Sequence, residues 1–515
     1  MPPAPSPPPD RATQLFGLAL ALGAAGCAAG VARHALAMRF SHDDWEWLAR
    51  GRDVPALVAE QLSFRSEVFR PVPRDLFALS LALFGLRTLP LAAFFLGVHA
   101  LCAWQVARLG AALGLSRWAG AFAALLVFFG RESVEAFDFF SLNQVILSRL
   151  LVVAALTALL REERPPWWRW LPLTLAALGT HEQSALAAPL FLLCLVYRDG
   201  PAALRGLPRA PARRAFLAVC VGYGLLRVAL LDPARQGSHA LGFGALGFKA
   251  GVFVDHVAAF LHAHFGTGEA ALPTLVTLAA FLFWCYRRTR RALPTLGLGA
   301  AWALVGYGPY FLAIHETSGY HFALALVGLA LPAGALLDFW LFDPGLPRAV
   351  RLLAMPLALW VALPVWPHPP LITHKDFSAG ARVVDLLRAG LRGAPGREPV
   401  RLIFLDDEWE PRGPPPFYLV QMSGEFDFNL DEHPTDNRNG ALALNFPGRD
   451  VRVWVLGPTW APLACARPGD VVLRVAHRRA GTGEARLGFE PLPKCADPPP
   501  GLADPVDAAR RADAR

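Results

Sequence analysis

Two adjacent carboxylates, Asp43 and Asp44, follow directly after the first long apolar segment of the chain. A pair of this kind can supply a general base or coordinate a divalent cation. The alternative is structural, because Ser41 and Asp44 are spaced as in a helix capping box. Trp45 and Trp47 would then anchor a short helix at a membrane surface. The pair therefore marks either a catalytic site or the start of a helix.

Polar side chains interrupt the apolar sequence again at three later points, where Glu135 precedes Asp138, His181 precedes Glu182, and Tyr320 precedes His321. The first two carboxylates are spaced for one face of a helix. His181 is either an ordinary hydrogen-bonded residue or a functional one, and the neighbouring Glu182 favours the second reading, because a charge within an apolar segment is costly unless it is used. The histidine-bearing stretch 232–271 is expected to be an external loop, with a metal site there as the weaker reading.

The distribution of charge separates the chain into two parts. Only 17% of all residues are charged, against about 25% in soluble domains. Residues 371–515 carry 39 charged side chains among 145, whereas residues 1–370 carry 51 among 370. The first part therefore reads as a membrane domain and the second as a soluble one. The net charge of +8 lies in the membrane part, where arginines orient a protein, so it does not indicate nucleic-acid binding.

A membrane-spanning helix needs about 20 mostly apolar residues, and shorter half-helices occur inside bundles. By this measure eleven spans are expected, near 14–37, 89–113, 117–130, 142–160, 168–180, 183–197, 215–231, 272–287, 293–314, 320–341 and 349–366. Arginine clusters at 161–169, 198–214 and 287–291 then fall on the cytoplasmic side. The C-terminal part falls outside the cytoplasm. A single kinked span over 168–197 would reverse everything after it.

The expected domain boundaries follow from these spans. Residues 1–13 and 498–515 are expected to be disordered, residues 14–370 form the membrane domain with a first external loop at 38–88, and residues 371–497 form a small α/β domain. Within that domain a helix is expected at 376–392, and strands at 400–405, 451–456 and 471–475. Asp406, Asp407 and Glu408 follow the first strand, either as ligands or as a charged turn.

Cysteines and known motifs add further limits. Cys27 follows a stretch that loosely resembles a lipoprotein cleavage site, but the apolar run continues past it, so an uncleaved first span is expected. Cys465 and Cys495 could form a disulfide outside the cytoplasm. The sequence contains no CxxC, HExxH or phosphate-binding glycine loop, which removes support for a metal hydrolase or a P-loop ATPase.

Residues 40–200 resemble the GT-C superfamily of polyprenyl-phosphate-sugar glycosyltransferases, with the pattern of the protein O-mannosyltransferase-like and TMTC-like membrane proteins. The resemblance is carried by Phe40 to Asp44, Phe69-Arg70-Pro71-Val72, Leu83-Phe84-Gly85, His99, Glu135-Ala136, and Thr180-His181-Glu182 leading to Pro189, with a weaker echo at Tyr320 to Gly328. The chain departs from the pattern at Gly130-Arg131, where the family has His-Pro, and at His181, where it has Lys. The TPR repeats of the TMTC-like proteins are missing.

The resemblance implies a GT-C-like helical bundle that transfers a sugar from a polyprenyl phosphate at the extracytoplasmic face. It implies that Asp43 or Asp44 is the base or binds a divalent cation, which is the one candidate cofactor. It implies that the donor phosphate is bound by Arg70, Arg74, Arg131 and His181, and that the donor or acceptor pocket includes Glu135, Asp138, Glu182, Tyr320 and His321. The partners would be the lipid-linked sugar, membrane lipids and an envelope glycan, lipid or protein as acceptor, in an inner-membrane protein.

Two other functions fit the same sequence. A transporter or flippase of a lipid-linked substrate would also be polytopic, but neither an inverted repeat nor paired broken spans are visible. A non-catalytic assembly protein is favoured by the altered His-Pro and Lys-Glu elements. Sugar transfer is the expected function, since the order and spacing of the motifs agree with it.

Overall fold

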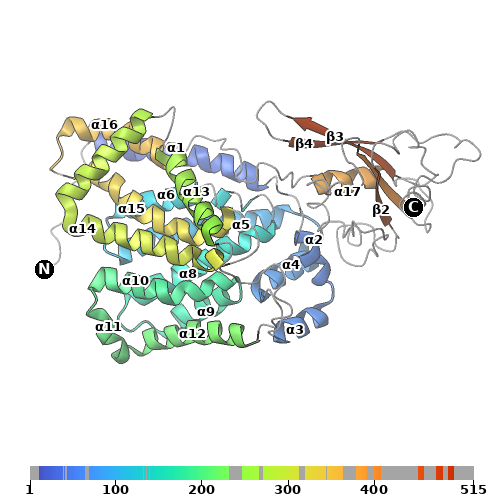
Figure 1. Cartoon of the computed structure of the whole chain (residues 1–515), viewed down its shortest axis with the longest axis horizontal. Coiled ribbons are helices and arrows are strands. Elements are labelled where there is room, and N and C mark those ends of the chain that lie inside the picture. The colour runs from blue at the N-terminus through green and yellow to red at the C-terminus, as the bar shows by residue number, and fades with distance from the viewer. Residues whose placement is uncertain are drawn as a thin grey trace, which may run out of the picture.

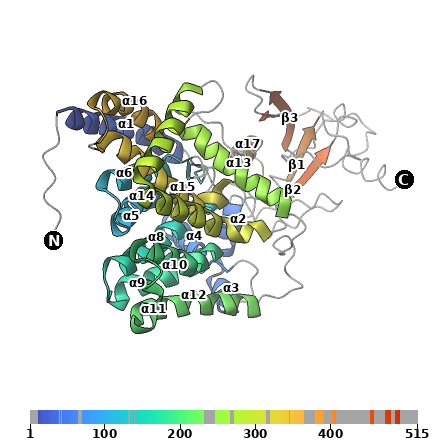
Figure 2. The same ribbon diagram turned by 60° about the vertical axis from the view of Figure 1, so that its left-hand side comes forward.

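The computed structural model describes residues 11–36, 38, 40, 43–63, 69–130, 133–134, 136–137, 140–230, 246–265, 271–312, 319–343, 345–363, 379–390, 400–406, 451–456, 471–479 and 485–491. The bundle is built from α1 (Arg11–Leu36), α5 (Leu89–Ala112), α6 (Arg117–Phe128), α8 (Asn143–Arg161), α9 (Trp167–Leu178), α10 (Ala187–Asp199), α12 (Pro211–Leu230), α13 (Leu246–Phe265), α14 (Ala271–Leu312), α15 (Ala323–Phe342) and α16 (Arg348–Ala362). Figures 1 and 2 show these helices as one layered bundle.

Shorter elements connect the long helices. They are α2 (Asp43–Arg50), α3 (Val54–Ser63), α4 (Pro71–Phe84) and α11 (Ala203–Gly206), with the 3-10 turns η1 (Phe140–Leu142), η2 (Glu182–Leu186), η3 (Leu207–Arg209) and η7 (Gly319–Phe322). Gly85 ends α4 with a φ of 60°, a conformation that glycine adopts without steric cost. This is the Leu-Phe-Gly turn of the sequence pattern.

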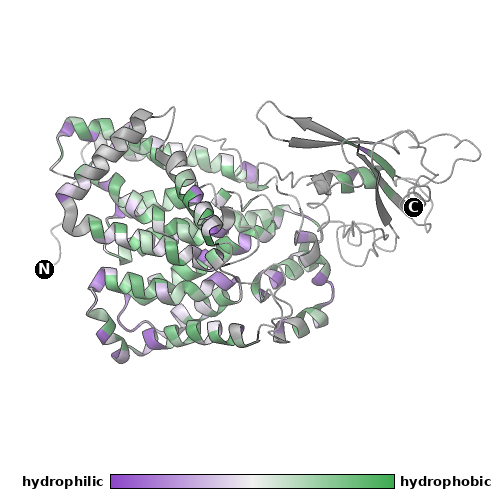
Figure 3. Ribbon diagram, viewed as in Figure 1, coloured by the Kyte–Doolittle hydropathy of each residue, from purple (hydrophilic) through white to green (hydrophobic). Residues whose placement is uncertain are grey.

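The chain is a helical membrane protein. Within the described residues, four helical stretches are long and apolar enough to cross a bilayer, namely Gln14–Leu36, Leu89–Ala112, Phe140–Arg161 and Ala323–Phe342. A bent pair, Glu182–Asp199 with Ala203–Arg209, would raise the number to five. In the most apolar part of the stretch ending in α8, 89% of the residues are buried, and this stretch lies at the centre of the bundle. In α1 the corresponding share is 17%, and α1 lies at the edge of the bundle. Figure 3 shows that apolar residues dominate these helices.

Two parts of the expected topology were wrong. The stretch 232–271 is not one loop, because residues 246–265 form α13, whose Phe253 packs on Tyr307 of α14 and Phe322 of η7. The spans expected at 272–287 and 293–314 are joined without a break in α14, which is 42 residues long. Arginine is a good helix former, so the cluster at 287–291 does not end a helix. Pro294 lies in α14 just after that cluster, and Figure 1 shows that α14 is not straight but turns along its length.

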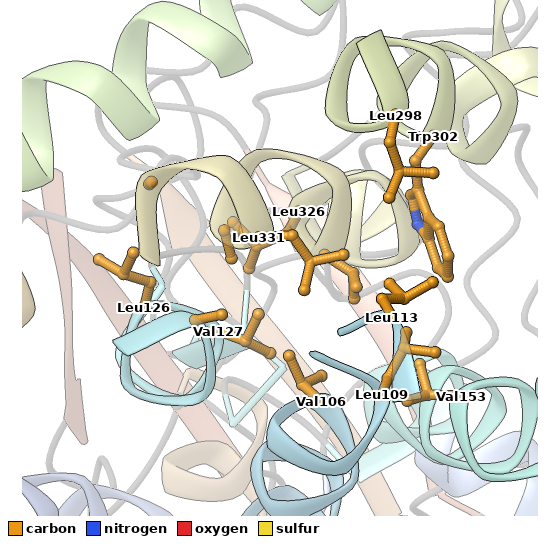
Figure 4. Close-up of a cluster of buried hydrophobic side chains, with 14 of the residues drawn as sticks. Val106, Leu109, Leu113, Leu126, Val127, Val153, Leu298, Trp302, Leu326 and Leu331 are labelled. Carbon is orange, nitrogen blue, oxygen red and sulfur yellow. The ribbon is translucent and has the colours of Figure 1, made fainter. Parts of the chain in front are cut away.

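The core is packed from α5, α6, α8, α14 and α15. Figure 4 shows side chains of all five helices meeting, among them Val106, Leu109, Leu126, Val127, Val153, Trp302, Leu326 and Leu331. In a bilayer, helices associate through close packing rather than by escaping water, so small residues are needed at the contacts. A Cβ on Gly334 of α15 would lie 2.3 Å from the carbonyl oxygen of Ala119 on α6. The two backbones therefore touch at this glycine.

The two ends of the bundle are formed by different helices. Helices α2, α3 and α4 form a cap at one end, and the chain begins at the other, where α11 and the turn of α14 also lie (Figures 1 and 2). Within the cap the ring centroids of Trp47 and Phe77 are 5.2 Å apart. Gly51 lies against the backbone of Ala78, where a Cβ would be 2.9 Å from the Ala78 Cα. Packing of α2 on α4 therefore sets the shape of the cap.

A four-stranded sheet lies beyond the capped end (Figure 1). Its strands are β1 (Val400–Asp406), β2 (Val451–Leu456), β3 (Val471–Arg479) and β4 (Ala485–Pro491), in the order β2-β1-β3-β4. β1 runs parallel to β2 and β3, and β4 runs antiparallel to β3. Helix α17 (Ala379–Gly390) packs against β4. The expected helix and three strands occur within a few residues of their expected positions, and β4 was not expected.

Candidate functional site

Asp44 is fully buried, and its carboxylate is held by the beginning of another helix. Its two oxygens accept the backbone N–H groups of Phe140, at 3.0 Å, and Ser141, at 2.6 Å. These residues form η1, which leads directly into α8. A carboxylate at a helix N-terminus satisfies orphan N–H groups and is stabilised by the helix dipole. Asp44 therefore caps α8. The sequence suggested that Asp44 belongs to a capping box at its own helix, whereas in the structure it caps a helix that is distant in the sequence.

The other member of the pair, Asp43, is the first residue of α2. Because both oxygens of Asp44 already accept backbone donors inside the protein, Asp44 is poorly placed to receive a substrate proton or a cation. Within the described residues there is no group of three or more metal-binding side chains. The side chain of Asp43 lies outside the part of the chain that the structure describes.

Arg70 and Glu182 form an ion pair at the same end of the bundle. The Nε and Nη2 atoms of Arg70 each lie 3.0 Å from Oε2 of Glu182. Arg70 immediately precedes α4, and Glu182 begins η2, so the pair joins segments that are 112 residues apart. The backbone N–H of Val72 also donates to the carbonyl oxygen of Gly179 at 3.0 Å. The start of α4 is thereby fixed to the break between α9 and α10.

His181 lies between α9 and η2 and is a neutral residue. Its Nδ1 accepts the backbone N–H of Gln183 at 3.2 Å, so the ring carries its proton on Nε2. The 3.8 Å separation from Oε2 of Glu182 is therefore not an ion pair. As a phosphate ligand His181 could offer one N–H donor and no charge.

The break at η2 is held in place by polar contacts from three other segments, α14, η7 and α8. The Nε2 atom of Gln183 donates to the carbonyl oxygens of Gly306 at 3.1 Å and His321 at 3.0 Å. The hydroxyls of Ser184 and Ser148 are 2.7 Å apart. Irregular backbone at membrane depth is tolerated where protein surrounds it or where it lines a cavity. These contacts bring His321, one of the expected pocket residues, to the same break as Glu182.

Helix α12 contributes two side chains that the sequence analysis missed. The guanidinium carbon of Arg227 lies 5.6 Å from the ring centroid of Phe69, the residue before Arg70. Tyr223 is one turn earlier on the same face of α12, and the charges of Glu182, Arg70 and Arg227 all act on its hydroxyl. α12 packs directly against η2. The signal that could have found them is an arginine four residues after a tyrosine within an apolar segment.

A second polar network lies deeper in the bundle, around the histidine of the sequence pattern. Nε2 of His99 is 3.1 Å from Oδ1 of Asn143, and the His99 ring stacks on Phe137 with centroids 4.1 Å apart. Arg149 is 1% exposed and donates from Nε to the Cys102 sulfur at 3.2 Å and from Nη1 to the Ala323 carbonyl at 3.1 Å. No carboxylate among the described residues pairs with Arg149. This network links α5, α8 and α15.

The remaining expected site residues divide into two groups. Arg74 is 6% exposed and lies one turn after Arg70, on the same side of α4. Tyr320 belongs to η7, next to His321, whose ring centroid is 4.4 Å from that of Tyr310. Outside the described residues lie Arg131, Glu135, Asp138, Asp407, Glu408, Cys465 and Cys495.

No protein-family model, curated protein or solved structure matches this chain. Its function is therefore inferred from the side chains that meet at the capped end of the bundle.

Proposed function

We propose that this chain is a membrane glycosyltransferase of the GT-C type, which moves a sugar from a polyprenyl phosphate to an acceptor outside the cytoplasm. The observation that carries the proposal is the packing of α2 against α4 at one end of the bundle. In support, Asp43 and Asp44 begin α2, and Arg70, which pairs with Glu182, directly precedes α4, so both pairs belong to helices of the cap. A carboxylate base and a guanidinium for phosphate are the two groups that such a transfer needs.

The proposal includes an orientation and a number of crossings. We assign the arginine-rich segments 161–169, 198–214 and 287–291 to the cytoplasmic side. In support, α11 and the turn of α14 lie at the end where the chain begins, away from the cap and the sheet (Figure 1). At 42 residues α14 is about 63 Å long, twice what one crossing requires. We count α13 and the first half of α14 together as one crossing, so that the chain crosses the membrane eleven times. An odd number of crossings from a cytoplasmic N-terminus leaves the sheet outside the cytoplasm.

In the proposed reaction Asp43 takes the proton of an acceptor hydroxyl. The acceptor oxygen attacks the anomeric carbon from the face opposite the phosphate, so the configuration inverts. The bond between the anomeric carbon and the phosphate oxygen breaks, and polyprenyl phosphate leaves with the bonding electrons. Arg70, Arg74 and Arg131 would stabilise the negative charge that collects on the departing phosphate. Asp44 keeps α2 in register with α8 and so positions Asp43.

The test measures donor cleavage, which does not require the acceptor to be known in advance. Purified protein in lipid nanodiscs is mixed with a panel of radiolabelled polyprenyl-phosphate hexoses and pentoses and a membrane extract, and released polyprenyl phosphate is counted. Asp43→Asn should lower release at least a hundredfold at an unchanged melting temperature. Asp75→Asn is the matched control, because Asp75 is an exposed carboxylate of the same cap that accepts from Gln61 at 2.8 Å.

Two results would contradict the proposal. If the wild-type protein releases polyprenyl phosphate from no member of the panel, sugar transfer is wrong. Movement of the lipid-linked sugar across liposomes without cleavage would then favour a flippase, and capture of partners through the sheet would favour an assembly protein. If Asp43→Asn retains release, transfer stands and the assignment of the base falls.

A further inference from the structure

The Tyr223 hydroxyl and one oxygen of Glu182 are buried polar atoms without a partner in the described part of the chain. Both the Tyr223 Oη and the Glu182 Oε1 are shielded from solvent, and neither makes a hydrogen bond to any residue that the structure describes. Buried polar groups are nearly always hydrogen-bonded, and leaving one unpaired is expensive. A tyrosine hydroxyl donates and accepts, whereas a carboxylate oxygen only accepts. The two atoms are thus complementary to a ligand that carries hydroxyl groups.

Positive charge lies beside these two atoms. Arg70 holds Oε2 of the same carboxylate, and Arg227 stands over Phe69, one turn along α12 from Tyr223. Guanidinium groups bind phosphate through paired hydrogen bonds. A ligand that spans the cluster would therefore have an anionic end and a hydroxyl-bearing end.

The ion pair beside these two atoms is partly exposed. The side chain of Glu182 is 35% exposed and that of Arg70 is 18% exposed, although both lie against a break within the helical bundle. The surrounding contacts of Gln183 and Ser184 hold this break in place. A site of this kind suits a ligand that arrives along the bundle with its tail in the lipid.

We propose that Tyr223 and Glu182 bind the sugar hydroxyls of the lipid-linked donor, while Arg227 lies at its phosphate. This inference rests on the proposed function and deepens it, because it assigns recognition of the sugar to α12, a helix outside the sequence pattern. Tyr223 and Glu182 then discriminate a polyprenyl-phosphate sugar from the bare polyprenyl phosphate that is the product. Arg227 contributes equally to the binding of both.

The test compares two lipid probes on the full-length protein in nanodiscs. The probes are the polyprenyl-phosphate hexose that the wild type cleaves best and polyprenyl phosphate itself, with binding measured by displacement of a fluorescent polyprenyl phosphate. Tyr223→Phe removes only the hydroxyl and should weaken binding of the sugar-bearing lipid about tenfold, with no change for the bare lipid. Arg227→Leu should weaken both by about the same factor. Tyr286→Phe, at an 82% exposed tyrosine of α14, is the control and should change neither.

The outcomes separate this inference from the function on which it rests. If the wild type cleaves its donor but Tyr223→Phe binds both lipids as the wild type does, the role of α12 is wrong and sugar transfer stands. If Tyr223→Phe weakens both lipids equally, the hydroxyl contacts the phosphate and the assignment to the sugar is wrong. If the wild type neither cleaves any donor nor binds either lipid, both proposals fall. A melting temperature for each variant excludes loss of folded protein as the cause.

Discussion

The carboxylate of Asp44 accepts the backbone N–H of Ser141 at 2.6 Å, across 97 residues of sequence. The same side chain also holds Phe140, so a single buried residue joins the first loop to the start of the central helix α8. This contact separates the two neighbouring carboxylates by role. It makes Asp44 a residue that positions the cap, and it leaves Asp43 as the candidate base.

Asp44→Ala should therefore destabilise the protein strongly. The change leaves two buried N–H groups without acceptors, which costs about 2–4 kcal/mol. Thermal unfolding in detergent, followed by tryptophan fluorescence, should show a clearly lower melting temperature than for Asp75→Ala, which alters an exposed carboxylate. If Asp44→Ala melts like the wild type, the contact with η1 is not what orders the cap.

The ion pair between Arg70 and Glu182 should show energetic coupling. In a double-mutant cycle with Arg70→Met and Glu182→Gln, the coupling should be about 1 kcal/mol, since a third of the Glu182 side chain is exposed and water screens the pair. The free energies of unfolding of the wild type, the two single variants and the double variant are measured by unfolding in sodium dodecyl sulfate. Additive effects would show that the two side chains act independently. The pair Arg169 and Glu162, which is more exposed, gives the comparison and should couple less.

Arg149 should be replaceable without loss of stability. Arg149 is 1% exposed, and among the described residues its guanidinium has only a thiol and a carbonyl as acceptors, so the buried charge costs desolvation without an ion pair there to offset it. Arg149→Met keeps most of the volume and removes the charge. We expect a melting temperature equal to or above that of the wild type. A marked fall would mean that the bonds to Cys102 and Ala323 outweigh the cost of burying the charge.

Packing of α15 on α6 should be sensitive to one methyl group. Gly334→Ala would place a Cβ 2.3 Å from the Ala119 carbonyl oxygen, so the helices must separate, at a cost of about 1–3 kcal/mol. Gly297→Ala is the control, because nothing lies within 4 Å of the added carbon, and it should be neutral or stabilise α14 by up to about 1 kcal/mol. Equal effects of the two changes on the unfolding midpoint would contradict the close approach.

The proposed orientation can be measured by labelling single cysteines. In a variant without its seven natural cysteines, Ala56→Cys on α3 and Ala202→Cys before α11 each place a thiol at an exposed residue. A membrane-impermeant maleimide added to intact cells should label the first and not the second. The reverse pattern would place the cap in the cytosol and remove the basis for transfer from an extracytoplasmic donor.

Most of the helical bundle could be predicted from the sequence, because long apolar runs are local features. The expected spans at 89–113 and 142–160 match α5 and α8 within one or two residues. Charge misled the prediction at α13 and α14, where arginine, lysine and histidine suggested loops although these residues are compatible with helices. The Asp43–Asp44 pair was also visible in the sequence, but its two members could not be told apart.

Only the tertiary structure decided which polar residues meet. The partners of Asp44 are backbone N–H groups of η1, and the side chains of η1 do not reveal that these groups are its partners. Glu182 pairs with Arg70, which lies 112 residues away in the sequence. Tyr223 and Arg227 joined the site because α12 packs on η2. Apolar runs predict where helices form, because the hydrogen bonds of a helix join residues that are close in the sequence. The neighbours of each helix depend on side-chain packing between distant segments, which no local pattern contains.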